Sequence, residues 1–280
     1  MIVRRYIDGP YGQIHLRIAG TGKPLLLLHQ SPLSGDQFRA VLPLLAAAGF
    51  CAVAMDTPGF GQSALPAEPI AIPGYADAVP AVLSALGWDR AHIVGHHTGA
   101  SIAINLAARY PALIDRLVLN GVALLSDEDR AHFAQFRFAP LELKADGSHL
   151  LAAWNQRLSA STGWRDLAAM HRYVVEMLAN PEAYHRGFTA AFAYDKSVDL
   201  MAITAQTLIF SNSGEDLYEA SRRAHALRPD FAFAALDGGT HDIIDEQPEA
   251  WTAAVTAFLN AQKNGLRGGS GRDHDIAQSS

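Results

Sequence analysis

The segment Val94-Gly95-His96-His97-Thr98-Gly99-Ala100 is the point from which the rest of the chain can be ordered. A short apolar run precedes it and a run of small residues with helical spacing follows, so the sequence predicts a sharp turn from a strand into a helix. Such a turn needs glycine two residues before and two residues after its apex, because strand and helix come too close there for side chains. Gly95 and Gly99 meet this need and leave His97 at the apex.

Short apolar runs of strand length alternate with helical patterns on both sides of this turn. A hairpin is predicted around residues 3–6 and 13–19, strands at 24–28, 51–55, 92–94, 117–119, 207–210 and 231–236, and helices at 38–48, 75–86, 100–109, 217–227 and 248–259. This alternation predicts right-handed strand-helix-strand units and a mostly parallel sheet. The binding crevice of such a sheet lies beyond the carboxyl ends of its strands.

The alternation stops between residues 123 and 199, where aromatic residues occur without strand-like runs. We predict a mostly helical cap over the crevice, in which some aromatic side chains line a pocket and most pack within the cap. The core then comprises residues 1–122 and 200–263. The segment 264–280 is rich in glycine, serine and charge, so we expect it to be a disordered tail.

Composition narrows the class of partner. The net charge of −6 gives no basic footprint for nucleic acid or an anionic membrane, which makes a neutral or anionic small molecule the expected ligand. One cysteine excludes an internal disulfide, and neither a signal peptide nor an apolar run of about 20 residues is present. We therefore expect a cytoplasmic protein, and the sequence gives no indication of its oligomeric state.

The order of the motifs resembles that of the α/β-hydrolase superfamily over nearly the whole chain. The motifs are the loop His29-Gln30-Ser31-Pro32, the turn from Asp56 to Ser63, the turn around His97, the cap, and late loops that carry an acid and a histidine. This resemblance implies an α/β-hydrolase fold, with a mostly parallel eight-stranded sheet flanked by helices and an inserted helical cap. It also implies that His97 replaces the serine nucleophile of the family.

The same resemblance assigns the other site residues. The catalytic acid is expected in the loop after the strand that follows the cap, at Asp216, with Glu215 as the alternative, and the catalytic histidine is His241. The backbone N–H groups of Thr98 and Ser31 would form the oxyanion hole. Gln30 and His96 are further candidates for substrate binding.

These residue types suit acid-base chemistry. A histidine titrates near neutrality, and a carboxylate can fix its tautomer, so His241 with Asp216 would serve as a general base. His97 would act as a second acid or base, as a hydrogen-bond donor or as a nucleophile. His29 and His96 also have a structural interpretation, and Cys51 is expected to be a buried apolar residue. Although His29, His96, His97 and His241 share one rim, their spacing matches no zinc motif, so we expect neither metal nor cofactor.

We therefore predict a hydrolase of small esters, lactones or C–C bonds next to a carbonyl. The absence of a serine keeps two alternatives open. One is lyase, decarboxylase, isomerase or cofactor-free oxygenase chemistry on the same fold. The other is a ligand-binding protein that has lost turnover.

Overall fold

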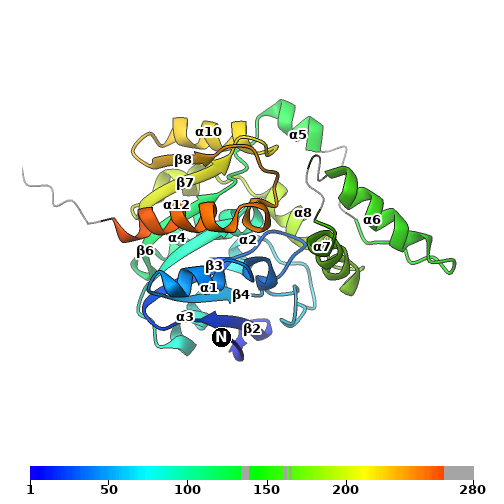
Figure 1. Cartoon of the computed structure of the whole chain (residues 1–280), viewed down its shortest axis with the longest axis horizontal. Coiled ribbons are helices and arrows are strands. Elements are labelled where there is room, and N and C mark those ends of the chain that lie inside the picture. Colours follow the sequence, from blue (N-terminus) through cyan, green and yellow to red (C-terminus); the bar gives the residue numbers. More distant parts are fainter. Residues whose placement is uncertain (134–138, 161–162, 164–165, 262–280) are drawn as a thin grey trace, which may run out of the picture.

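The computed structural model describes residues 1–133, 139–160, 163 and 166–261, so the predicted tail at 264–280 lies outside the described residues. Within this part, eight strands form one sheet in the order β1-β2-β4-β3-β5-β6-β7-β8 (Figure 1). The strands are β1 (Ile2–Gly9), β2 (Gly12–Ala19), β3 (Lys23–Leu28), β4 (Phe50–Met55), β5 (Ala91–His96), β6 (Ile114–Asn120), β7 (Gln206–Asn212) and β8 (Ala232–Leu236). From β4 to β8 along this order all neighbours are parallel, and only β2 runs antiparallel, to both of its neighbours β1 and β4. The predicted fold class is confirmed.

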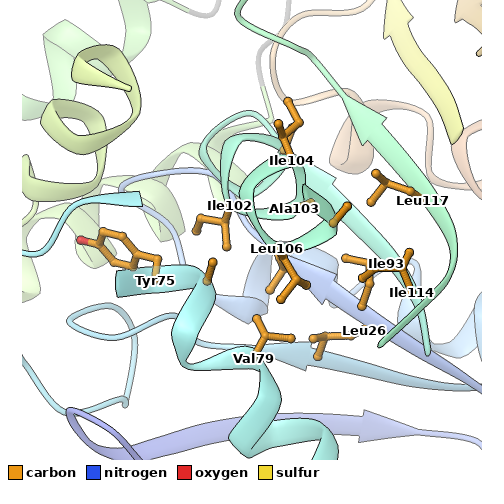
Figure 2. Close-up of a cluster of buried hydrophobic side chains, with 14 of the residues drawn as sticks. Leu26, Tyr75, Val79, Ile93, Ile102, Ala103, Ile104, Leu106, Ile114 and Leu117 are labelled. Atoms are coloured by element: carbon orange, nitrogen blue, oxygen red, sulfur yellow. The ribbon is translucent and has the colours of Figure 1, made fainter. Parts of the chain in front are cut away.

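Helices cover both faces of the sheet, because its central strands carry apolar side chains on both sides. On one face, α2 (Ile72–Asp77), α3 (Val79–Leu86) and α4 (Thr98–Arg109) pack on the sheet; Figure 2 shows part of this core. On the other face, α1 (Leu42–Ala47) and α12 (Pro248–Asn260) pack on Val94, Val118 and their neighbours. This packing on both faces fixes the positions of the strand ends from which the site loops begin.

Two predicted helices are interrupted. The segment 75–86 is not one helix but the end of α2 followed by α3, because Pro80 has no N–H to donate to the carbonyl of Ala76. The segment 38–48 divides in the same way into a 3₁₀ turn at Gly35–Phe38 and α1, whose second residue is Pro43. Proline therefore sets both boundaries.

Five helices lie between β6 and β7 in the described part of the chain, where the cap is predicted. They are α5 (Asp127–Phe133), α6 (Ser148–Ala160), α7 (Leu167–Ala179), α8 (Arg186–Ala193) and α9 (Ser197–Ala202), and α6 and α7 stand beside the sheet at the right of Figure 1. The boundaries of a separate cap stay a prediction. The remaining helices are α10 (Tyr218–Leu227) and α11 (Ile243–Glu246). None of the helices in the described residues is long and apolar enough to cross a bilayer.

Candidate active site

The candidate site is centred on the turn between β5 and α4. His97 has φ 50° and ψ −103°, and it is the only non-glycine residue with positive φ in the described segments. A Cβ on Gly95 would lie 2.2 Å from the carbonyl oxygen of Gly99, and a Cβ on Gly99 would lie 2.0 Å from that of Leu28. The two glycines thus permit the close approach that the sequence predicted.

The carboxylate of Glu215 is the partner of His97. His97 Nε2 lies 2.7 Å from Glu215 Oε2, and the Ser211 hydroxyl donates to Glu215 Oε1 at 2.5 Å. Because a carboxylate only accepts, Nε2 carries a proton, and in the neutral ring Nδ1 keeps its lone pair. The Glu215 side chain is fully buried, whereas that of His97 is 15% exposed. The acid is therefore fixed in place while the ring retains an accessible edge.

The pair expected from the sequence, His241 with Asp216, is not formed among the described residues. Asp216 is exposed, while the neighbouring Glu215 points inward to His97. Consecutive side chains of this loop face opposite ways, so a one-residue difference decides which carboxylate enters the site. The geometry brings together His97 and Glu215, the residue that the sequence offered as the alternative acid.

His241 contacts a residue of α6 instead. The guanidinium of Arg157 bonds both His241 Nε2 and the carboxylate of Asp242. Arginine is only a donor, so His241 Nε2 must accept and the imidazole is neutral with its proton on Nδ1. Burial, and then the charges of Arg157 and His97, hold the pKa of His241 well below its usual range. In this arrangement His241 has no free lone pair with which to act as a base.

His96 lies under His97, with 4.1 Å between the ring centroids. Gln37 fixes its tautomer: the Gln30 N–H donates to Gln37 Oε1 at 3.0 Å, so the Gln37 amide nitrogen must donate to His96 Nδ1, 2.7 Å away. The His96 proton is therefore on Nε2. Burial, followed by electrostatic coupling to the neighbouring rings of His97 and His241, lowers the pKa of His96 well below its usual range.

The two predicted oxyanion positions are neighbours. The Ser31 N–H donates to the Thr98 hydroxyl at 3.3 Å, which brings the loop after β3 against the first residue of α4. Gly187 of α8 closes this loop from above, since a Cβ there would lie 2.0 Å from Ser31 Oγ.

His29 has the contacts of a structural residue. Its Nδ1 donates to the Gln30 carbonyl at 2.8 Å, and its Nε2 accepts from the Thr57 N–H at 3.0 Å. Burial lowers the pKa of His29 to about 4, so the ring is neutral at pH 7. Among the described residues, no group of three or more His, Cys, Asp or Glu side chains is placed to hold a metal ion.

Sequence reasoning missed Arg157 and Gln37. Arg157 lies in the cap segment and 84 positions from the histidine that it contacts, so only the folded arrangement identifies it. Gln37 lies just before the predicted helix 38–48, and its position in the sequence gave no indication of a partner.

Known proteins share both the sequence pattern and the fold. A sequence model described as the alpha/beta hydrolase fold matches residues 23–195. The chain belongs to the α/β-hydrolase fold family. RutD of Caulobacter sp. (strain K31), provisionally named a carbamate hydrolase, is 26% identical over 91% of this chain and 97% of its own length.

Two other comparisons span most of the chain. The 2-(acetamidomethylene)succinate hydrolase of Mesorhizobium japonicum (strain LMG 29417 / CECT 9101 / MAFF 303099) is 24% identical over 92% of this chain and 96% of its own length. The crystal structure of a hydrolase from Pseudomonas aeruginosa PA01 has a TM-score of 0.78 at 24% identity, covering 92% of this chain and 98% of its own. These relatives are hydrolases, which supports the prediction that this α/β-hydrolase family member is an enzyme of that class.

Proposed function

We propose that this chain hydrolyses a small carbonyl compound, such as an ester, a lactone or a C–C bond next to a carbonyl, with His97 and Glu215 as its general base. The observation that supports it is the 2.7 Å contact between His97 Nε2 and the buried Glu215 carboxylate at the apex of the turn. A histidine oriented by a carboxylate can take a proton and return it within one turnover.

A general base fits this geometry better than a nucleophile. The nitrogen with the available lone pair is Nδ1, which adjoins the ring carbon bonded to Cβ, so an acyl group placed on it would crowd the backbone of the turn. Removing a proton from water needs much less space. Water, rather than the imidazole, would then attack the carbonyl carbon.

The developing oxyanion would lie near the backbone N–H of Thr98, with the N–H of Ser31 as a second donor once it turns from the Thr98 hydroxyl. Thr98 begins the twelve-residue helix α4, whose N-terminal end carries partial positive charge. Loss of one such donor typically costs about 10²–10³ in rate. In this mechanism His241 is a neutral donor or a positioning group, and Asp216 has no role.

Matched carboxamide variants test the assignment of the acid. Glu215→Gln and His97→Gln should each lower kcat/KM by about 10²–10⁴, the usual contribution of a general base, in a panel of acyl esters, lactones and β-diketones. Asp216→Asn, one residue away and exposed, should stay within about twofold of wild type. A large loss in Asp216→Asn with normal turnover in Glu215→Gln would refute the proposal.

Mass spectrometry after a substrate quench separates the two roles of His97. A general base leaves the protein unmodified, so no acyl adduct should accumulate in wild type or in His241→Ala. An acyl group on the peptide that contains His97 would instead show a nucleophile.

One observation keeps non-hydrolytic chemistry as the second candidate. The apex of the turn carries neither hydroxyl nor thiol, and a base there can also remove a proton from carbon. A lyase, decarboxylase, isomerase or cofactor-free oxygenase would act in this way, and a binding protein would show no turnover at all. Hydrogen exchange at the carbon next to a ketone carbonyl in D₂O, lost in His97→Gln and unaccompanied by hydrolysis, would favour this candidate.

A further inference from the structure

Helices α6 and α7 pack on each other in an apolar cluster of their own. Ala153 of α6 lies there with Val174 and Met177 of α7 and with Tyr184, and none of these residues belongs to the two clusters that cover the sheet. A cavity, rather than close packing, separates part of α7 from the loops after β3 and β4. In Figure 1 the two helices stand side by side at the right of the molecule. Their apolar packing is therefore separate from that of the core.

The next helix, α8, belongs to the core instead. Ala190 is part of the apolar cluster on the sheet. Gly187 lies against the loop after β3, since a Cβ there would be 2.0 Å from Ser31 Oγ. The boundary between the core and the α6–α7 pair therefore lies between α7 and α8.

Two arginines join the α6–α7 pair to the core, one from each helix. Arg157 bonds the carboxylate of Asp242, and Arg172 bonds that of Asp245. These two acids lie on one turn at the start of α11, so both arginines reach the same place. Burying an ion pair removes hydration that both charges regain when they separate into water. Such pairs can therefore open more readily than apolar packing would.

The turn that receives both arginines also carries His241. Arg157 donates to His241 Nε2 as well as to Asp242, and it stacks over the Tyr173 ring of α7 with 4.0 Å to the centroid. One guanidinium thus links α6, α7 and the ring of His241. If the helix pair leaves the turn, the guanidinium leaves with it, and the lone pair on Nε2 becomes free.

We propose that α6 and α7 move as one unit, which Arg157 and Arg172 latch onto the turn at the start of α11, and that the latched position is autoinhibitory because it occupies His241 Nε2. This inference rests on the proposed function, since it concerns the regulation of the same site. Opening gives the site a second base in addition to His97. The structure described above is the latched position, in which His241 takes no proton.

Diethylpyrocarbonate tests the proposal without any turnover, because it acylates a histidine nitrogen that has a free lone pair. The rate of modification of His241 is followed by mass spectrometry of its peptide at pH 7, in wild type, Arg157→Met and Arg172→Met. Both variants should react about tenfold or more faster than wild type, within the range of typical conformational couplings. Equal rates in all three proteins would overturn the proposal.

The result for Arg172→Met is the decisive one. The acidic partners of Arg172 are Asp36 and Asp245, so its loss frees His241 only if α6 and α7 open together. Fast modification in Arg157→Met with a wild-type rate in Arg172→Met would show two independent contacts and would contradict the latch.

Two controls separate opening of the helix pair from general destabilisation. Arg109→Met removes an arginine that pairs with Asp77 between α4 and α2, so His241 should react within about twofold of the wild-type rate. His29 has both ring nitrogens bonded within the core and should stay unmodified in every variant. Modification of His29 together with His241 would contradict the proposal, because the opening would not be confined to α6 and α7.

The failure of each proposal can be told apart. Reactivity of His241 that depends on Arg172, together with full turnover in His97→Gln, would reject the mechanism and keep the latch. Turnover lost in His97→Gln, with His241 equally slow to react in every variant, would do the reverse.

Discussion

His97 has a backbone conformation that few residues adopt, and its ring is held by neighbours on two sides. Glu215 fixes Nε2, and Gly121 leaves the space that the ring fills. A Cβ on Gly121 would lie 2.1 Å from His97 Cδ2 and 2.5 Å from Nε2. Gly121 itself has φ +68°. The position after β6 is therefore glycine for two reasons, backbone conformation and room for the imidazole.

Gly121→Ala should displace the His97 ring and lower activity. Gly87→Ala is its matched control, since Gly87 has φ +70° but nothing within 4 Å of its added Cβ. Backbone strain should destabilise both variants by about 1 kcal/mol, and overpacking should cost Gly121→Ala a further 1–3 kcal/mol, roughly. Urea unfolding and the rate of ester hydrolysis measure the two effects. Equal stability and equal activity in the two variants would contradict this account of Gly121.

The sequence could not predict which individual side chains contact one another in the site. The loop 211–216 could be identified as the place of the acid, but the choice between Glu215 and Asp216 depends on which side chain turns inward. Arg157 gave no signal at all, because its contact with His241 joins the cap segment to a loop more than 80 positions away. The sequence could predict that the site contains a carboxylate and histidines, but not which of these side chains form pairs.

The helix α7 encloses a second polar region at the junction with the core. A cavity of about 550 Å³ lies between α7 and the loops after β3 and β4. Glu176 faces it, and its Oε2 is buried without a partner among the described residues. Burial, together with the carboxylates of Asp36 and Asp56, raises the pKa of Glu176 to about 7 against the opposing effects of Ser34 and Arg172.

Glu176→Gln should make stability less dependent on pH. A carboxyl whose pKa is raised on folding stabilises the native state fully below its unfolded pKa of 4.5, and this contribution is lost as the pH rises through 7. From pH 4.5 to pH 8 the free energy of unfolding of the variant should therefore increase relative to wild type, by about 1–2 kcal/mol after allowance for solvent screening. Urea titrations at the two pH values measure the difference. Glu182→Gln, at an exposed position, should give no such change.

The overall fold of the molecule is determined largely by short features of the sequence. Apolar runs of strand length predict the central strands, and Gly95 with Gly99 predicts how closely β5 and α4 approach. Parallel pairing then brings the polar loops of distant segments to one edge of the sheet. This is why the fold and the region of the site could be predicted from one sequence. The contact between α6 and His241, by contrast, depends on side-chain packing between distant segments.

The buried histidines His29, His96 and His241 should make the whole molecule sensitive to acid. Burial lowers the pKa of His29 to about 4 and that of His96 and His241 well below 6.5. A histidine whose pKa is lowered on folding stabilises the native state above its unfolded pKa of 6.5, and this contribution is lost as the pH falls toward 4. The free energy of unfolding should therefore decrease over this window, and each of these histidines adds up to about 1.4 kcal/mol per pH unit to the slope.

Urea titrations between pH 7 and pH 4.5 should give a shallower slope for His29→Gln than for wild type. The exposed His171→Gln should keep the wild-type slope, and identical slopes in all three proteins would show that the buried rings are not the cause.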